Sequence, residues 1–237
     1  LFTEEDCLSM KVVDEFVKRG ERMIKPLSDI VSEQYNWTRD MPEWWAVTHT
    51  MFILGAIGGK ESVMPLLRGT RFAAAYDCEW VTEELPSIFG KVGIVAIDEL
   101  KKFAMDKTSD WYVRSIAIEG LAAITLYNLH IEKDIFQFIH SILKNSDEDR
   151  EVRQTAGSVL IDFLRSEYKQ DLIAFSIEER ELKEKDIDYL NRFDEMDVEN
   201  GFLEDEKDLW LYTKDWLSFY NEDEIKKRQK RWEEEEN

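Results

Sequence analysis

The chain has 237 residues, of which 43% are hydrophobic and 35% charged, with 51 acidic against 31 basic side chains. The formal net charge of −20 repels phosphate backbones and anionic lipid headgroups, which argues against nucleic acid and membrane surfaces as partners. No apolar run reaches the roughly 20 residues that span a bilayer. No secretory signal is visible from Leu1 onward. Two cysteines, Cys7 and Cys78, are too few for a disulfide framework, and their separation resembles no zinc site. We therefore expect a cytoplasmic protein without a cofactor or bound metal.

The first recurring signal along the chain is a glycine followed at a fixed distance by a proline. It occurs at Gly20 with Pro26 and again at Gly59 with Pro65, and a weaker copy begins at Gly93. Glycine ends a helix because it accepts the left-handed conformation cheaply, and proline is tolerated near the start of the next helix. Each copy therefore predicts the joint of a helical hairpin.

A second signal recurs with the same period in the middle of the chain. Residues 110–121 and 149–160 share the frame Asp-x-x-Val-Arg-x-x-Ala-x-x-x-Leu, and the two copies are as far apart in sequence as Gly20 and Gly59. Self-similarity at such a period is typical of stacked-repeat proteins, in which each unit buries its apolar face against its neighbours. The frame predicts the architecture, whereas the chemistry stays open because such scaffolds host unrelated functions.

Both copies of the frame have apolar residues at three- and four-residue spacing, which predicts amphipathic helices with one buried stripe. Small residues on this stripe, Ala117, Gly120 and Ala156, allow neighbouring helices to approach closely. Replacing them with leucine should overpack the array.

Together the two signals predict five helical hairpins, and nowhere does the sequence show the sustained alternation of a strand. We expect an all-α protein built as a right-handed α-solenoid, with residues 1–177 forming the repeat array. The hairpins are expected at 4–35, 43–77, 79–106, 110–145 and 149–177.

The frames at 110 and 149 and the joints at 20 and 59 resemble HEAT-like repeats of the phycobilisome-lyase type, over about residues 4–177. The layout is also similar to a bacterial group of HEAT-like proteins of unknown function, some of which end in a cysteine-rich metal-binding tail that this chain lacks. The resemblance implies a ladder of acidic and arginine side chains between adjacent units. It assigns a structural role to Asp110, Arg114, Asp149 and Arg153.

Residues 178–237 differ from the repeats in composition. The stretch 178–208 has 14 acidic and 5 basic residues with irregularly spaced apolar ones, and 208–220 is rich in aromatic side chains. We expect short helices and loops that form a helical cap over the end of the array, followed by a solvated helix at 222–236. The acidic stretch at 194–201 has the wrong ligand positions for a calcium loop and is interpreted as a solvated acidic loop.

Other chemical signatures in the sequence are weak. Residues 55–62 are one position short of a phosphate-binding loop and follow a helix instead of a strand, which favours a repeat joint. His49, His130 and His140 form no metal-binding pattern. Glu83 and Glu84, before Pro86, are typical of a helix start. We expect no catalytic residue, although enzymatic activity stays undecided.

Large aromatic residues open successive helices at similar places. Inter-repeat packing is the first interpretation of this pattern. The alternative is a groove in which Trp and Tyr anchor a partner's helix or peptide. The candidate anchors are Trp44, Trp80, Trp111 and Tyr112.

The sequence thus predicts a non-enzymatic scaffold that binds a protein or peptide through the concave face of the array, with a basic or amphipathic segment as the preferred partner. The alternative is a HEAT-like enzyme or small-ligand binder that uses carboxylates and aromatic side chains in the groove; it predicts an enclosed pocket containing a carboxylate of perturbed pKa. A third possibility is that the acidic C-terminal region folds into the groove and regulates access.

Overall fold

The computed structural model of the chain describes residues 1–185, 193–203 and 206–235. Within these ranges every regular element is an α-helix or a short 3-10 helix and no strand occurs, so the predicted all-α class is confirmed. In the same ranges, no helix is at once long and apolar enough to cross a lipid bilayer.

The segment before residue 186 forms helices that follow one another in pairs. The N-terminal ones are α1 (Met10–Arg19), α2 (Ile24–Ser32), α3 (Trp45–Ile57) and α4 (Lys60–Ala75). The middle ones are α5 (Glu79–Thr82), α6 (Leu85–Val92), α7 (Ile97–Ala104), α8 (Trp111–Thr125) and α9 (Glu132–Lys144). The series ends with α10 (Arg150–Asp162) and α11 (Lys169–Lys185). Residue 177, the predicted end of the array, lies inside α11.

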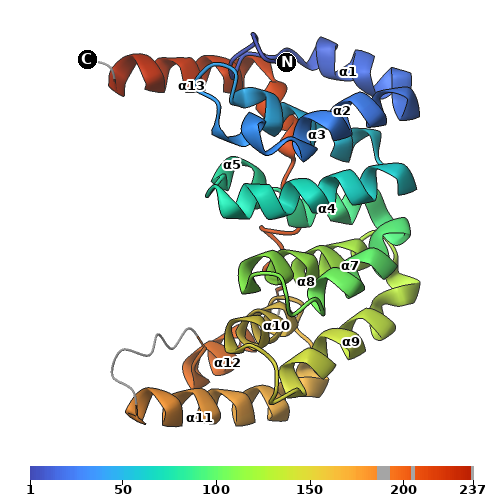
Figure 1. Cartoon of the computed structure of the whole chain (residues 1–237). Helices are drawn as coiled ribbons and strands as arrows, with labels where there is room; N and C mark the ends of the chain where they lie inside the picture. Colours follow the sequence, from blue (N-terminus) through green and yellow to red (C-terminus); the bar gives the residue numbers. More distant parts are fainter. Residues whose placement is uncertain (186–192, 204–205, 236–237) are drawn as a thin grey trace.

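These helices lie in two layers, stacked along the long direction of the molecule (Figure 1). In one layer, α3 packs against α6, α6 against α8, and α8 against α10; in the other, α2 packs against α4 and α9 against α11. Contacts of α7 with α8 and of α9 with α10 join the layers. The apolar stripes of both layers form one continuous core, which includes the fully buried Leu54, Ile88, Leu121 and Leu160.

Glycines mark the joints between paired helices, as the sequence predicts. Gly20 follows α1 with φ +55°, Gly59 precedes α4 with φ +77°, and Gly93 follows α6 with φ +81°. An L side chain is strained in this left-handed region, which explains why glycine stands there. Pro26 is the third residue of α2, whereas Pro65 is the sixth residue of α4 and so lies deeper in its helix than the pattern suggests.

Small residues allow α6 and α8 to approach closely, as predicted for Gly120. A Cβ atom at Gly120 would lie 3.0 Å from the Cβ of Phe89, and one at Gly90 would lie 3.0 Å from the Cβ of Ala123. Real Cβ atoms seldom come this close, so each glycine meets a helix that has no room for a side chain.

The region after α11 contains a helix where the sequence analysis expects an acidic loop. Here α12 (Glu195–Gly201) begins at a capping box in which Asp194 Oδ1 accepts the Asp197 N–H and Asp197 Oδ2 accepts the Asp194 N–H, each at 2.9 Å. The two carboxylates satisfy backbone donors at the helix start, which stabilises the helix against the loop. Residues 186–192 and 204–205 of the predicted cap lie outside the described residues.

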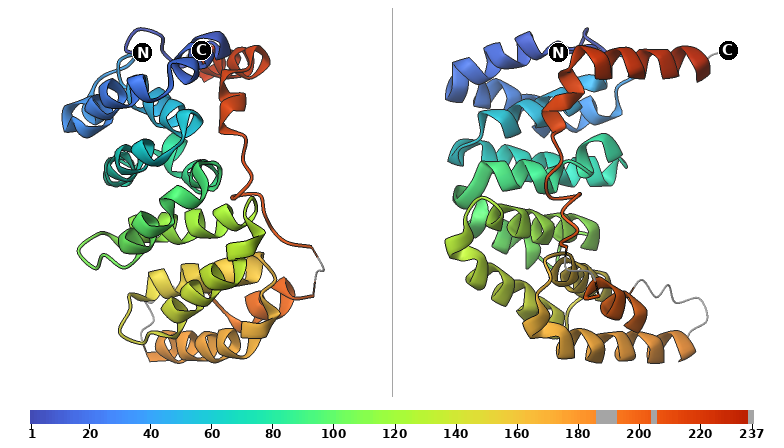
Figure 2. Two further views of the ribbon diagram at one scale, coloured as in Figure 1. Left: turned by 90° about the vertical axis from the view of Figure 1, so that its right-hand side faces the viewer. Right: turned by 180° about the vertical axis from the view of Figure 1, so that it is seen from behind.

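The chain then returns along the layer of α3, α6, α8 and α10. Residues 206–221, here called the C-terminal strap, run from α12 back to α3, and α13 (Glu222–Glu235) lies beside the N-terminal segment (Figure 2). The last turn of the strap is a 3-10 helix, Trp216–Tyr220. Both chain ends therefore lie at the same end of the stack, and the C-terminal region follows its length in addition to contacting the last helices.

Candidate functional site

The side chains assigned to a ladder connect neighbouring helix pairs. Arg114 is fully buried; its Nε donates to the carbonyl of Ala104 at 2.8 Å, and its Nη1 donates to Asp149 Oδ2 at 2.8 Å. Asp149 belongs to the next pair along the chain. A second carboxylate, Glu148, lies 2.7 Å from Arg114 Nη2, so two acidic groups surround this buried cation.

Arg153, the equivalent position in the second copy of the frame, repeats the carbonyl contact but finds its acid on α11, within its own helix pair. Its Nε donates to the carbonyl of Leu143 at 2.9 Å, and its two terminal nitrogens contact the carboxylate of Glu178 at 3.0 and 2.9 Å. Asp110 instead caps α8, where its side chain accepts the backbone N–H of Tyr112 at 2.8 Å. Both arginines thus bond to a carbonyl at the end of the preceding helix, but Arg114 pairs with acids at the start of the next helix pair, whereas Arg153 pairs with Glu178 on α11 of its own pair.

The C-terminal strap is held to the helices by polar contacts along its length. Near α10, the Tyr212 hydroxyl donates to Asp162 Oδ2 at 2.6 Å. At α3, the Trp216 indole N–H donates to the carbonyl of Phe52 at 3.2 Å. Two cavities lie between the strap and the helices beside these contacts.

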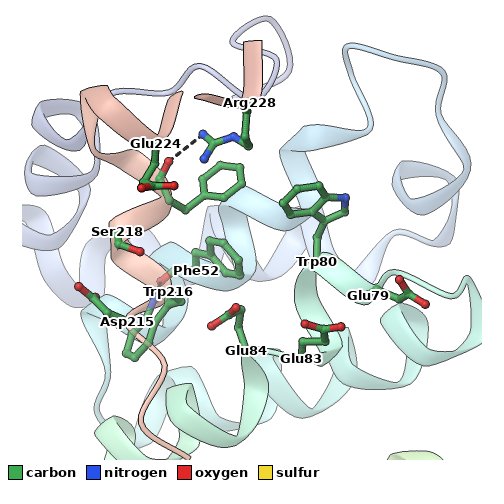
Figure 3. A pocket seen from close by; sticks show the side chains of 11 residues that line it. Phe52, Glu79, Trp80, Glu83, Glu84, Asp215, Trp216, Ser218, Glu224 and Arg228 are labelled. Carbon is green, nitrogen blue, oxygen red and sulfur yellow. Dashed lines mark hydrogen bonds between the residues drawn. The ribbon is translucent and has the colours of Figure 1, made fainter. Parts of the chain in front are cut away.

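One cavity, here called the Trp80 pocket, lies between the strap, α3, and the α5–α6 segment, with a volume of about 400 Å³ (Figure 3). Phe52, Trp80, Trp216 and Phe219 supply its aromatic walls. Trp80 is 37% exposed and stands edge-on to Trp45 and Phe219, with ring centroids 5.4 and 5.9 Å away. The acidic lining residues are Glu79, Glu83, Glu84, Asp215 and Glu224.

The cations near the Trp80 pocket are already engaged in contacts within the chain. Arg228, in the pocket lining, lies over the Phe219 ring and donates to the backbone carbonyls of Asp6 and Phe219 at 2.9 and 2.7 Å. Lys214, at the edge, places its Nζ 2.9 Å from Glu83 Oε2 and 3.7 Å from Glu84 Oε1.

Glu84 is the least satisfied of these carboxylates. Its Oε2 is buried and has no hydrogen-bond partner within the described residues. Burial raises the pKa of Glu84 above its usual range, while the nearby Lys214 opposes this shift. A cation placed in the pocket would stabilise the ionised form of Glu84.

The four predicted aromatic anchors have different positions. Trp80 lines the pocket just described, whereas Trp44 is half-buried and stacks edge-on against the core residue Trp45. Trp111 lines a second cavity beside the next pair of helices. Tyr112 is 37% exposed, and its hydroxyl is hydrogen-bonded to the side chain of Thr82.

The second cavity, here called the Glu119 pocket, has a volume of about 280 Å³ and lies between α8, α10 and the strap. Its acidic residues are Glu119 on α8 with Glu151 and Asp162 on α10; Trp111, Leu211 and Tyr212 supply apolar surface. Thr155 and Ser158 add hydroxyl groups.

Two carboxyls of the Glu119 pocket have strongly shifted acidities. Burial, reinforced by the neighbouring Asp162, raises the pKa of Glu119 to about 8. Burial also raises the pKa of Asp162 to about 6, although its hydrogen bond from Tyr212 opposes the shift. At neutral pH Glu119 is therefore mainly protonated and Asp162 mainly ionised.

The histidines lie apart from these pockets. His49 is buried; its Nε2 lies 2.6 Å from the carbonyl of Glu5 and its Nδ1 3.2 Å from the Tyr220 hydroxyl, and burial lowers its pKa to about 4. His140 pairs with Asp171 at 2.8 Å and stacks on a tyrosine ring. His130 lies in the 3-10 turn Leu129–Ile131.

One group of side chains in the described ranges has the spacing of metal ligands: Glu5, Asp6 and Cys7. Asp6 already accepts from the Trp232 indole N–H at 3.0 Å and pairs with Arg228 at 3.3 Å. Burial raises the pKa of the Cys7 thiol to about 11, which disfavours the thiolate that a metal requires. This group joins the chain ends through hydrogen bonds.

The sequence analysis missed Glu119 and Asp162 entirely and interpreted Glu83 and Glu84 only as a helix start. The helix start is confirmed, since α6 begins at Leu85, but the same carboxylates also bind Lys214. For Glu119 a signal was present: it is the single charged residue between 115 and 126. No protein-family model, curated protein or solved structure matches the chain.

Proposed function

We propose that the chain is a HEAT-like α-solenoid of the cytoplasm that acts as a non-enzymatic scaffold and binds a basic segment of a partner protein at the Trp80 pocket. The composition of the pocket lining supports the proposal. It has five carboxylates, four aromatic side chains and one arginine, and this arginine is already hydrogen-bonded within the chain. A lysine or arginine side chain has an apolar stem and a cationic end. Aromatic rings can cover the stem and attract the cation, while the carboxylates pair with it.

The solenoid part of the proposal is supported by the two-layered stacking and by the matching contacts of Arg114 and Arg153. Both arginines bond to a carbonyl at the end of the preceding helix, which belongs to the preceding pair, and Arg114 also bonds to Asp149 at the start of the next pair. Repeated contacts of this kind fix the offset between adjacent units, as expected of an array in which each unit packs only on its neighbours.

Lys214 provides an internal example of the recognition that we propose. Its ammonium group pairs with Glu83 and Glu84 and lies over the ring of Trp210, with Nζ 4.0 Å from the ring centroid. A basic segment of the partner would find the same carboxylates at the open side of the pocket and would compete with Lys214 for them.

The test is fluorescence anisotropy with a labelled amphipathic peptide of leucine and lysine, compared with a peptide in which glutamate replaces lysine. At low salt, where electrostatic attraction extends furthest, the lysine peptide should bind and the glutamate peptide should not. The double variant Glu83→Gln and Glu84→Gln should weaken binding by about tenfold or more, since each desolvated charge pair contributes on the order of 1 kcal/mol or more. The matched control is Glu61→Gln on the exposed start of α4.

A second variant tests the competition with Lys214 in the opposite direction. Lys214→Gln should strengthen peptide binding because it frees the carboxylate pair, whereas Lys25→Gln, which changes the net charge equally at an exposed site, should have little effect. Equal binding of both peptides, or equal effects of Lys214→Gln and Lys25→Gln, would contradict the proposed site.

A further inference from the structure

We propose that the Glu119 pocket is a separate binding site for a primary ammonium group, independent of the partner site at the Trp80 pocket. The cavity is bounded by three elements and lined by acids, hydroxyls, the Gln154 amide and apolar surface, without a basic residue. A ligand that enters this space meets three acidic side chains, hydroxyl and amide groups, and ring surface from Trp111 and Tyr212.

Glu119 is the carboxyl of this pocket with the largest upward pKa shift and without a cationic partner in the described part of the chain. Within the described part of the chain its carboxyl has no hydrogen bond or ion pair, and its nearest electrostatic influence is the like charge of Asp162. A desolvated carboxylate without a cation is costly, which favours the protonated form of Glu119 at neutral pH. A ligand cation would remove that cost.

The remaining polar groups of the pocket include acceptors for the donors of an ammonium group. Asp162 is held in place by the Tyr212 hydroxyl at 2.6 Å, and Thr155 by its contact with Ser115 at 2.8 Å. An ammonium group has three donors and no acceptor, so it can bond to Glu119, Asp162 and a hydroxyl oxygen at once. A phosphate or carboxylate ligand would instead be repelled.

Binding is coupled to proton release, because the ammonium ion favours the ionised form of Glu119. The charged and titratable groups that face this site are Glu119 on α8, Glu151 and Asp162 on α10, and Tyr212 on the strap, with Asp208 acting on Asp162. Below about pH 8, binding should release close to one proton, and affinity should rise up to tenfold per pH unit until Glu119 is ionised.

The experiment is calorimetric titration of the full chain with n-butylamine, with n-butanol as the neutral analogue of the same size. At pH 8.5 the amine is still charged, since alkylammonium groups titrate at about pH 10.4 as lysine does. We expect butylamine to bind and butanol not to bind. At pH 7, the binding enthalpies measured in phosphate and in Tris should differ by the difference between the ionisation enthalpies of the two buffers, multiplied by about one released proton.

Glu119→Gln keeps the size of the side chain and resembles its protonated form, so the variant should fold. It should lower butylamine affinity at least tenfold at pH 8.5 and abolish proton release, while Glu61→Gln should change neither. Glu83→Gln with Glu84→Gln should leave butylamine binding unchanged, which separates this site from the partner site. The proposal is overturned if butanol binds as well as butylamine, if Glu119→Gln binds like the native chain, or if no ligand carrying an ammonium group binds.

A free alkylamine and a lysine side chain both carry this group, and two arms of the experiment separate these sources. Binding of butylamine alone assigns the site to a small-molecule amine. If only the lysine peptide binds and its affinity falls with Glu119→Gln, the ammonium group comes from a polypeptide. Failure of both arms overturns the proposal.

Discussion

Glu119 should make the stability of the fold depend on pH in an unusual direction. Its pKa is about 8 in the folded chain, against 4.5 for an ordinary glutamate. The folded state therefore holds one more proton than the unfolded state between these values, and stability falls as pH rises through this window. The stabilisation is fully present below pH 4.5 and is lost above pH 8.

The magnitude follows from the width of this window. Each unit of pKa shift corresponds to about 1.4 kcal/mol, so raising the pH from 5 to 9 should destabilise the native chain by about 4 kcal/mol through this group alone. Glu119→Gln cannot ionise and should not lose this energy. At pH 5 the two proteins should unfold at similar urea concentrations, and at pH 9 the variant should be the more stable.

The assay is urea unfolding followed by circular dichroism at several pH values, with Glu61→Gln as the control for loss of one acidic charge. The difference between native and Glu119→Gln stability is the informative quantity, because it cancels the other titrating groups. A companion variant, Asp162→Asn, should move the midpoint of this difference to lower pH, since Asp162 contributes to the shift. If the stability difference were the same at pH 5 and pH 9, Glu119 would titrate normally and the reasoning on its desolvation would be refuted.

Three further predictions concern the scaffold. Arg114→Ala should cost about 3–5 kcal/mol in urea unfolding, because it leaves the buried carboxylate of Glu148 without its cation, whereas Lys25→Ala at an exposed pair should cost less than about 1 kcal/mol; similar losses for both variants would contradict a larger contribution of the buried pair. Gly120→Leu should destabilise by about 1–3 kcal/mol or more and lower the melting temperature, because even a Cβ would lie 3.0 Å from Phe89; an unchanged melting temperature would contradict this close packing. The His49 ring should stay neutral down to about pH 4 when followed by NMR. Because the ring binds a proton more readily in the unfolded chain, the free energy of unfolding should decrease as the pH falls below 6.5. Titration of the ring near pH 6.5 would show instead that it is solvated.

Several features of this protein were determined by local sequence and could be predicted from it. The three- and four-residue spacing of apolar side chains predicts helices, and left-handed glycines at 20, 59 and 93 predict where they are joined. These patterns depend on residues within one or two helical turns, so a single sequence contains enough information for them. The start of α6 at the acids before Pro86 belongs to the same class.

The candidate sites depend on contacts that no local pattern describes. Lys214 meets Glu83, and Tyr212 meets Asp162, although the partners of each pair are far apart in sequence. The sequence analysis placed residues 178–237 as a cap at the end of the array, with folding into the groove as a further possibility, and nothing in their composition specified a return as far as α3. A strap of irregular structure has no period, and its course is decided by which exposed surface its aromatic side chains can cover.

Sequence alone therefore determined that the chain is helical, that its helices are joined at glycines, and that its net charge favours cationic partners. Only the tertiary structure decided which acidic side chains share a cavity, because α8, α10 and the strap must pack before Glu119 and Asp162 face the same space. The physical reason is the sequence separation over which each interaction acts. Helix formation is governed by neighbours along the chain, whereas the acidity of a buried carboxyl is governed by groups that folding brings around it.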